Sequence, residues 1–85
     1  PGYTLEQGSQ GPKVRQIQEQ LNVIAGAYPE IPKLEEDGIY GPETEAAVRK
    51  FQSIFGLPVT GEIDYKTWYK ISEIYVGVSR IAELS

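Results

Sequence analysis

The sequence contains no cysteine and no histidine among its 85 residues. These absences exclude thiolate nucleophiles, Ser-His-Asp triads, disulfide bonds and zinc sites with nitrogen or sulfur ligands. Basic residues are also scarce, since eight Lys and Arg stand against twelve Asp and Glu, giving a net charge of −4. Duplex nucleic acid and anionic membranes both attract basic surfaces, so we expect neither as a partner. No apolar run approaches the roughly 20 residues of a membrane span.

The short length limits how much surface the folded chain can bury. A domain of this size buries only about 60–65% of its unfolded surface, so the core needs nearly every apolar side chain. A deep substrate cleft is therefore not expected. The chain begins at Pro1 without the charged and apolar regions of a signal peptide, and we expect it to be a piece of a longer protein.

Three segments have the apolar spacing of amphipathic helices. Pro12 and Pro42 stand where a first helical residue needs no N–H, Gly56 is placed to end the second helix, and Asp64 is a suitable N-cap for the third. The predicted helices cover about residues 12–24 and 42–55, with a third after Asp64. The predicted fold is all-α, a compact three-helix bundle built from turn-helix repeats.

The last ten residues are read in two ways. Residues 1–75 form the predicted domain, and residues 76–85 form a tail or the start of a linker to a neighbouring domain. Because Gly inside a helix costs about 1 kcal/mol relative to Ala, we expect a kink or a break at Gly77. Apolar residues beyond it either form a short extra helix or pack against the next domain.

The helical segments belong to an internal repeat. Residues 8–21 align with residues 38–51 at an offset of thirty, and residues 61–71 align with residues 38–48 at an offset of twenty-three. Each unit begins with a Gly, where a positive φ costs little, and starts its helix shortly afterwards. The predicted core consists of Leu5, Val14, Ile17, Leu21, Ile39, Val48, Phe51, Leu57, Val59, Ile63, Trp68 and Ile71.

Three ordered motifs in this repeat resemble a known family. They are Gly8-Ser9-x-Gly11-Pro12, Asp37-Gly38-x-Tyr40-Gly41-Pro42 and Gly56-Leu57-Pro58-Val59-Thr60-Gly61, each followed by its helix. Together they closely resemble the peptidoglycan-binding domain of bacterial wall hydrolases, over about residues 5–75. The segment 28–36 is longer and richer in proline than the usual connection of that family. A related unit serves as the pro-region of animal matrix metalloproteases, but its inhibitory role depends on a cysteine that this chain lacks.

The resemblance implies a non-catalytic module that binds the cell wall and anchors an attached wall-modifying enzyme, such as an amidase or a cortex-lytic hydrolase. Its implied partners are peptidoglycan, through the glycan strand or the stem peptide, and a covalently linked catalytic domain. Its implied location is extracytoplasmic, in the cell wall or spore envelope of a bacterium. We expect no cofactor, no metal, no nucleic acid and no membrane insertion.

Candidate ligand contacts are polar or aromatic residues near the central motif. Tyr40 either offers its ring and hydroxyl to a sugar or fixes the turn onto the core, and Gly38 and Gly41 would let a ligand approach the backbone. Thr44 and Gln52 either contact a muropeptide or bond to neighbouring loops. Asp37 is interpreted mainly as a cap of the turn.

Helix three supplies two more candidates. Tyr65 and Tyr69 lie one turn apart on the face opposite the apolar stripe, where they are placed for stacking or for a domain contact. Trp68 lies on the apolar stripe and is interpreted as a core residue.

Carboxylates gather in residues 29–48, where six oppose the single Lys33. Glu43 and Glu45 fall in the first turn of the second helix, where negative charge favours the helix dipole. Regular calcium-loop spacing is absent, and a glycosidase pair would need a cleft that a chain of this size has no room for.

Two functions of different classes remain. The first is the wall-binding module. The second is a structural or interaction domain that docks on its own catalytic neighbour or on an envelope protein, through Tyr65, Tyr69 and the apolar tail. Retention on protein-free peptidoglycan distinguishes them.

Overall fold

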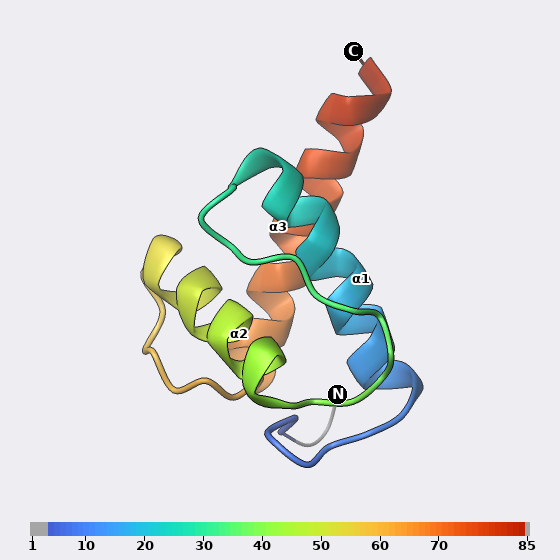
Figure 1. The fold of residues 1–85 in the computed structure, drawn as a ribbon. Helices are drawn as coiled ribbons and strands as arrows, with labels where there is room; N and C mark the ends of the chain where they lie inside the picture. The colour runs from blue at the N-terminus through green and yellow to red at the C-terminus, as the bar shows by residue number, and fades with distance from the viewer. Residues whose placement is uncertain (1–3, 85) are drawn as a thin grey trace.

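The computed structural model describes residues 4–84. These residues form three helices, α1 (Pro12–Ala27), α2 (Pro42–Ile54) and α3 (Tyr65–Leu84), with only isolated β-bridges between the connecting segments. Helices α1 and α3 pack directly against each other, and α2 lies to one side of this pair (Figure 1). The predicted all-α, three-helix fold is confirmed.

The helices begin where the sequence predicts. Pro12 and Pro42 occupy the first turns of α1 and α2, where the missing N–H has no helical partner to lose. The Asp64 carboxylate accepts a hydrogen bond of 2.9 Å from the Thr67 backbone N–H, which confirms it as the cap of α3. At the end of α2, Gly56 has a φ of +71°, the left-handed conformation that was predicted. Helix α1 continues three residues beyond its predicted end.

Helix α3 continues through Gly77 to Leu84, so the predicted break at Gly77 is wrong. A single interior Gly costs about 1 kcal/mol, which is small against the hydrogen bonds of an otherwise regular helix. The last turns of α3 extend beyond the rest of the molecule (Figure 1). Residue 85 lies outside the described residues.

The turns before the three helices pair with one another at one end of the molecule. Leu5 and Ile63 exchange backbone hydrogen bonds of 3.0 and 2.8 Å, and the Gly11 N–H donates to the Gly38 carbonyl at 2.9 Å. Gly38 has a φ of +74°, and a Cβ there would lie 3.2 Å from the Gly11 carbonyl oxygen. The repeat therefore has a structural cause, because each turn supplies the backbone partner of another.

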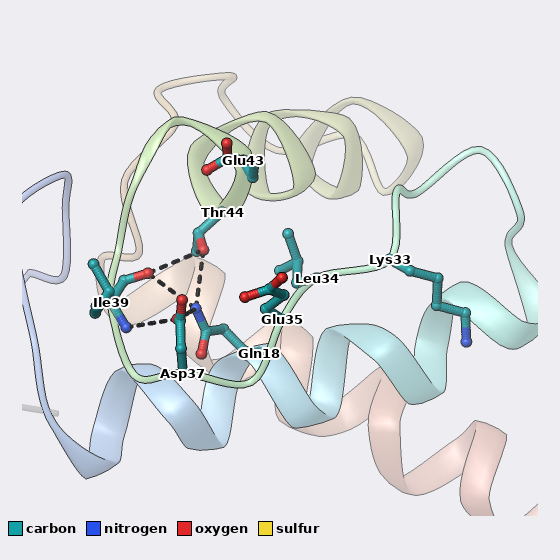
Figure 2. Close-up of a pocket in the computed structure, with 8 residues that line it drawn as sticks. All are labelled: Gln18, Lys33, Leu34, Glu35, Asp37, Ile39, Glu43 and Thr44. Carbon is teal, nitrogen blue, oxygen red and sulfur yellow. Dashed lines mark hydrogen bonds between the residues drawn. The ribbon is translucent and has the colours of Figure 1, made fainter.

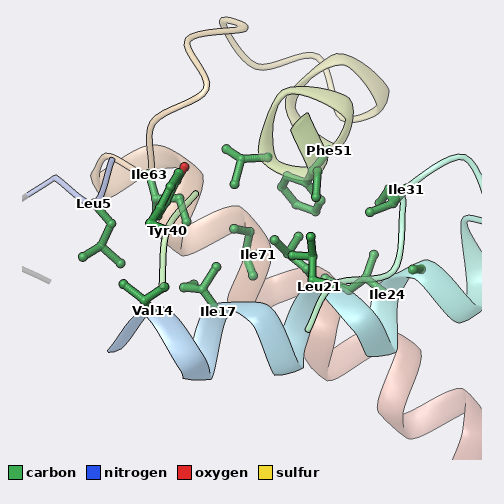
Figure 3. Packing of buried hydrophobic residues seen from close by; sticks show 14 residues of the cluster. Leu5, Val14, Ile17, Leu21, Ile24, Ile31, Tyr40, Phe51, Ile63 and Ile71 are labelled. Atoms are coloured by element: carbon green, nitrogen blue, oxygen red, sulfur yellow. The ribbon is translucent and has the colours of Figure 1, made fainter. Parts of the chain in front are cut away.

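The core fills the space between the helices and the turns (Figure 3). Its buried apolar side chains are Leu5, Val14, Ile17, Leu21, Ile24, Ala25, Ile31, Leu34, Tyr40, Ala47, Val48, Phe51, Ile63 and Ile71. Leu57 and Trp68, predicted as core residues, pack against this cluster while only partly buried.

Two core predictions are wrong. Ile39 is 51% exposed and Val59 is 49% exposed. Both lie in connecting segments, where no helical period decides which side chains point inward. Tyr40, next to Ile39, is buried in its place.

Candidate functional site

An open cleft of about 270 Å³ lies between α1, the long connection after it and the first turn of α2 (Figure 2). Its lining comes from all three segments: Gln18, Lys33, Leu34, Glu35, Asp37, Ile39, Glu43 and Thr44. A shallower hollow next to it shares Asp37 and Ile39, so these two residues form the ridge between them. The half-exposed Ile39 side chain is the main apolar group presented on this surface.

The floor of the cleft is organised by the buried Gln18 side chain. Its Nε2 group lies 3.1 Å from Asp37 Oδ1, 3.0 Å from the Ile39 carbonyl and 3.1 Å from Thr44 Oγ1 (Figure 2). Its Oε1 atom accepts a hydrogen bond of 2.8 Å from the Gly38 N–H. Because one amide bonds to the turn both as donor and as acceptor, this turn is fixed to α1 and forms a defined side of the cleft.

The long connection forms one wall of the cleft because Asn22 holds it against α1. The Asn22 side chain donates to the Leu34 carbonyl at 2.8 Å and accepts from the Leu34 N–H at 2.8 Å. Lys33 donates to the Asn22 carbonyl at 3.1 Å. The proline-rich segment that departs from the family pattern is therefore fixed in place and contributes Lys33, Leu34 and Glu35 to the cleft.

Asp37 stays ionised at the edge of the cleft. The Ile39 backbone N–H donates to its Oδ1 atom at 3.0 Å, and this bond, followed by the one from Gln18, holds the pKa of Asp37 below its usual value. The predicted capping role of Asp37 is confirmed. With Glu35 and Glu43 it gives the cleft a lining of carboxylate acceptors, whereas the Lys33 ammonium is turned toward α1, where it donates to the Asn22 carbonyl (Figure 2).

Three carboxyl groups should make the domain less stable at acid pH. Backbone or side-chain donors lower the folded-state pKa values of Asp37, Glu45 and Asp64. A lowered folded pKa gives stability that is present above the unfolded value and lost as pH falls through the folded one. We expect the melting temperature to fall below about pH 4. Asp64→Asn keeps a capping oxygen but cannot titrate, so its melting temperature should fall less at acid pH than that of wild type. Equal decreases in melting temperature for the two proteins would contradict this assignment.

A second buried glutamine repeats the arrangement one unit later. Gln52 Nε2 lies 3.1, 2.9 and 3.1 Å from Thr60 Oγ1, the Glu62 carbonyl and Thr67 Oγ1, and its Oε1 accepts from the Thr60 and Gly61 N–H groups at 3.0 Å. The four positions bound by Gln18 correspond to the four bound by Gln52 at an offset of twenty-three. Each glutamine therefore fixes the next turn to the preceding helix.

The structure buries several residues predicted to contact a ligand. Tyr40 is 1% exposed, and its hydroxyl donates to the Gly61 carbonyl at 2.6 Å, which contradicts the prediction that its ring is available for stacking. Gln52 is 0% exposed, so the prediction of a muropeptide contact is also contradicted. The structure shows the alternative in each case: Tyr40 fixes its turn onto the core, and Gln52 bonds to the neighbouring loop.

The other candidates near the central motif lie at the cleft or beside it. Thr44 is buried in the cleft floor, and Gly38 lines the adjoining hollow. Gly41 precedes α2 and lines neither. Ligand contact by these three residues stays a prediction.

Tyr65 and Tyr69 occupy a separate surface on α3. They are 66% and 61% exposed, and their ring centroids lie 5.4 Å apart. With Trp68 and Ser72 they line a shallow hollow. The predicted exposure of the pair is confirmed, and its role stays a prediction.

Sequence reasoning missed Gln18 and Ile39 as parts of a surface site. Gln18 had a signal, because it stands on the apolar stripe of α1 between Val14 and Leu21, where a polar side chain needs buried partners. Ile39 had none, since its exposure depends on how the turn packs.

The structure describes residues 4–84, with side chains through residue 81, and in this part of the chain no cluster of three or more acidic residues has a geometry that would hold a metal ion. Over the same range, no helix is both long and apolar enough to cross a membrane.

The comparison with known families matches residues 10–71 to the model described as "Putative peptidoglycan binding domain". The matched range contains the second and third turn motifs, the first motif from residue 10 onward, both buried glutamines and the whole cleft lining. The chain belongs to this peptidoglycan-binding domain family.

Relatives of this peptidoglycan-binding domain include longer proteins that are named as enzymes. It is 41% identical over 72 residues to a zinc D-Ala-D-Ala carboxypeptidase of Streptomyces albus G, a match that covers 84% of this chain and 27% of that protein. It is 50% identical over 46 residues to an autolytic lysozyme of Clostridium acetobutylicum, covering 54% of this chain and 13% of the lysozyme. The chain thus spans only a small part of these relatives.

Solved structures confirm the fold of the peptidoglycan-binding domain. The crystal structure of the SleB N-terminal domain superimposes with a TM-score of 0.75 at 29% identity, covering 88% of this chain and 96% of that one. A fused Zn-dependent amidase, peptidase and peptidoglycan-binding protein of Clostridium acetobutylicum gives 0.72 at 28% identity, covering 84% of this chain and 29% of that chain.

Proposed function

We propose that this domain binds peptidoglycan without catalysing its cleavage and anchors an attached wall-modifying enzyme to the polymer. The observation that carries the proposal is the cleft at Asp37 and Ile39, which lies wholly inside the family match. The relatives, named as a carboxypeptidase, a lysozyme and an amidase, support an enzymatic neighbour and a site of action in the cell wall or spore envelope, outside the cytoplasm.

The cleft offers groups that match a polymer of N-acetylated amino sugars and short peptides. Ile39 and Leu34 provide apolar surface for methyl groups and sugar C–H faces, while Asp37 and Glu43 provide acceptors for hydroxyl and amide donors. The carboxylate of Asp37 is held ionised, which suits an acceptor and not a proton donor.

Anchoring does not need tight binding by the isolated domain. An attached enzyme that is held near its polymer gains effective concentration, commonly in the mM range for short linkers. We propose that residues 76–85 connect the domain to such a neighbour, with α3 continuing as a helix into the connection.

The proposal is tested by co-sedimentation with protein-free peptidoglycan sacculi. We expect wild type to pellet, and Ile39→Ser to bind about tenfold more weakly, because removing about half of an isoleucine's burial costs roughly 1–1.5 kcal/mol. Val59→Ser is the matched control, since Val59 has nearly the same exposure, 49%, but lies outside the cleft. Both variants should melt like wild type.

Other outcomes have defined meanings. Equal binding by the Ile39 and Val59 variants would show that the binding site lies outside the cleft. A wild-type protein that stays in the supernatant would refute wall binding and favour the interaction domain that docks through α3.

A further inference from the structure

The exposed aromatic surface of α3 is not explained by the cleft. We propose that Tyr65, Trp68, Tyr69 and Ser72 form a second site, which binds the glycan strand by stacking its sugar rings. This inference rests on the proposed wall binding and names the saccharide, rather than the stem peptide, as the part recognised here.

The composition of the hollow favours an uncharged ligand with apolar faces. Its volume is about 380 Å³ and its lining consists of three aromatic rings and one hydroxyl-bearing side chain, with no carboxylate or ammonium. Pyranose rings present C–H faces that pack on aromatic rings and hydroxyl edges that bond to Tyr and Ser hydroxyls. The cleft differs, since its charged side chains suit the charged groups of a peptide.

The two tyrosines form a platform rather than part of the core. Their rings are tilted by 52° and lie 5.4 Å apart, so each leaves a face open to solvent. Among the side chains that the structure describes, in residues 4–81, none forms a hydrogen bond with either hydroxyl, so both can bond to a ligand. A contiguous pair of exposed aromatic rings is typical of an interaction surface.

Trp68 closes one side of the hollow and is held there from α1. The Lys13 ammonium lies 5.5 Å from the Trp68 ring centroid, within the range of a cation–π interaction, and the inner edge of the indole packs against the core. Trp68 is therefore a fixed wall, and its environment should change when a sugar enters.

Trp68 also supplies a direct readout, because it is the only tryptophan in the chain. The test is a titration of the chain with chitotetraose, a β-1,4-linked tetramer of N-acetylglucosamine, followed by Trp68 fluorescence. We expect a saturable change in wild type and about tenfold weaker binding by Tyr69→Ala and by Tyr65→Ala. Val76→Ala, which alters an exposed residue further along α3 outside the hollow, should bind like wild type.

Three results would overturn the second site. The first is an unchanged Trp68 signal while sacculi still pellet the wild-type chain, which would leave the proposed function standing. The second is a signal lost in Ile39→Ser but kept in Tyr69→Ala. The third is a dimer in sedimentation velocity that Tyr69→Ala disperses, which would assign the surface to a second copy of the chain. Failure of wild type to pellet is the separate result that refutes wall binding itself.

Discussion

Tyr40→Ala is expected to destabilise the domain by about 3–5 kcal/mol, the usual cost of removing a buried aromatic side chain. The ring of Tyr40 is buried between the turns, and its hydroxyl bonds to the Gly61 carbonyl, so both packing and a buried hydrogen bond are lost. A domain of this length has a total stability of only about 4–13 kcal/mol. The melting temperature should fall by at least about 12 °C.

The conservative variant separates the two contributions of Tyr40. Tyr40→Phe keeps the ring but leaves the Gly61 carbonyl without its partner, and we expect a loss of about 1–2 kcal/mol. Burial also raises the pKa of Tyr40 well above its ordinary value, so the hydroxyl remains a donor at any physiological pH. If Tyr40→Ala melts like wild type and loses only peptidoglycan binding, Tyr40 is a ligand contact and its placement in the core is wrong.

Gln52→Ala is expected to cost about 2–4 kcal/mol, because several buried groups lose their partners together. The side chain takes part in five hydrogen bonds that join α2 to the turn before α3. Among the groups left unpaired is the N–H of the buried Gly61. Chemical denaturation of the variant measures the loss.

Two further variants test the reason for that loss. Ser53→Ala changes the exposed neighbour on the same helix and should leave the free energy of unfolding unchanged within about 0.5 kcal/mol. Gln52→Glu keeps the acceptor for Gly61 but loses the amide donor. Its loss of stability should be largest at neutral pH, because there the buried carboxyl either carries an unfavourable charge or must hold a proton that it would release in water. An effect of Gln52→Ala no larger than that of Ser53→Ala would show that the network contributes nothing.

The helices were predictable because their signals are local. Pro12 and Pro42 open helices wherever the following residues carry a helical stripe, and Asp64 caps a helix through its own side chain. The continuation of α3 through Gly77 was not predictable in the same way. One residue's propensity is a weak guide when the residues on both sides favour a helix.

The burial of the turn residues is harder to predict from the sequence, because it depends on how the turns pair in the folded domain. Ile39 and Tyr40 are adjacent, both apolar enough for a core, and only one can point inward. The pairing of Gly38 with Gly11, and the bond from Tyr40 to Gly61, select Tyr40. The same choice exposes Ile39 and creates the candidate site.

The buried glutamines lie between these cases. Gln18 and Gln52 each interrupt an apolar stripe, which signals a buried polar side chain, but the sequence does not show which backbone groups they bind. Once the turns are placed, the offset of twenty-three between the two sets of partners explains why the repeat retains Thr44 and Thr67.

The most direct test of the account follows backbone amide chemical shifts of the isotope-labelled chain during titration with a soluble disaccharide-peptide fragment of peptidoglycan. We predict saturable shifts at the cleft, in Asp37, Gly38, Ile39 and Thr44, while the buried turn around Gln52 and Gly61 stays unchanged. No shift at saturating fragment, or shifts that leave the cleft residues unaffected, would contradict the claim that this cleft binds the wall polymer.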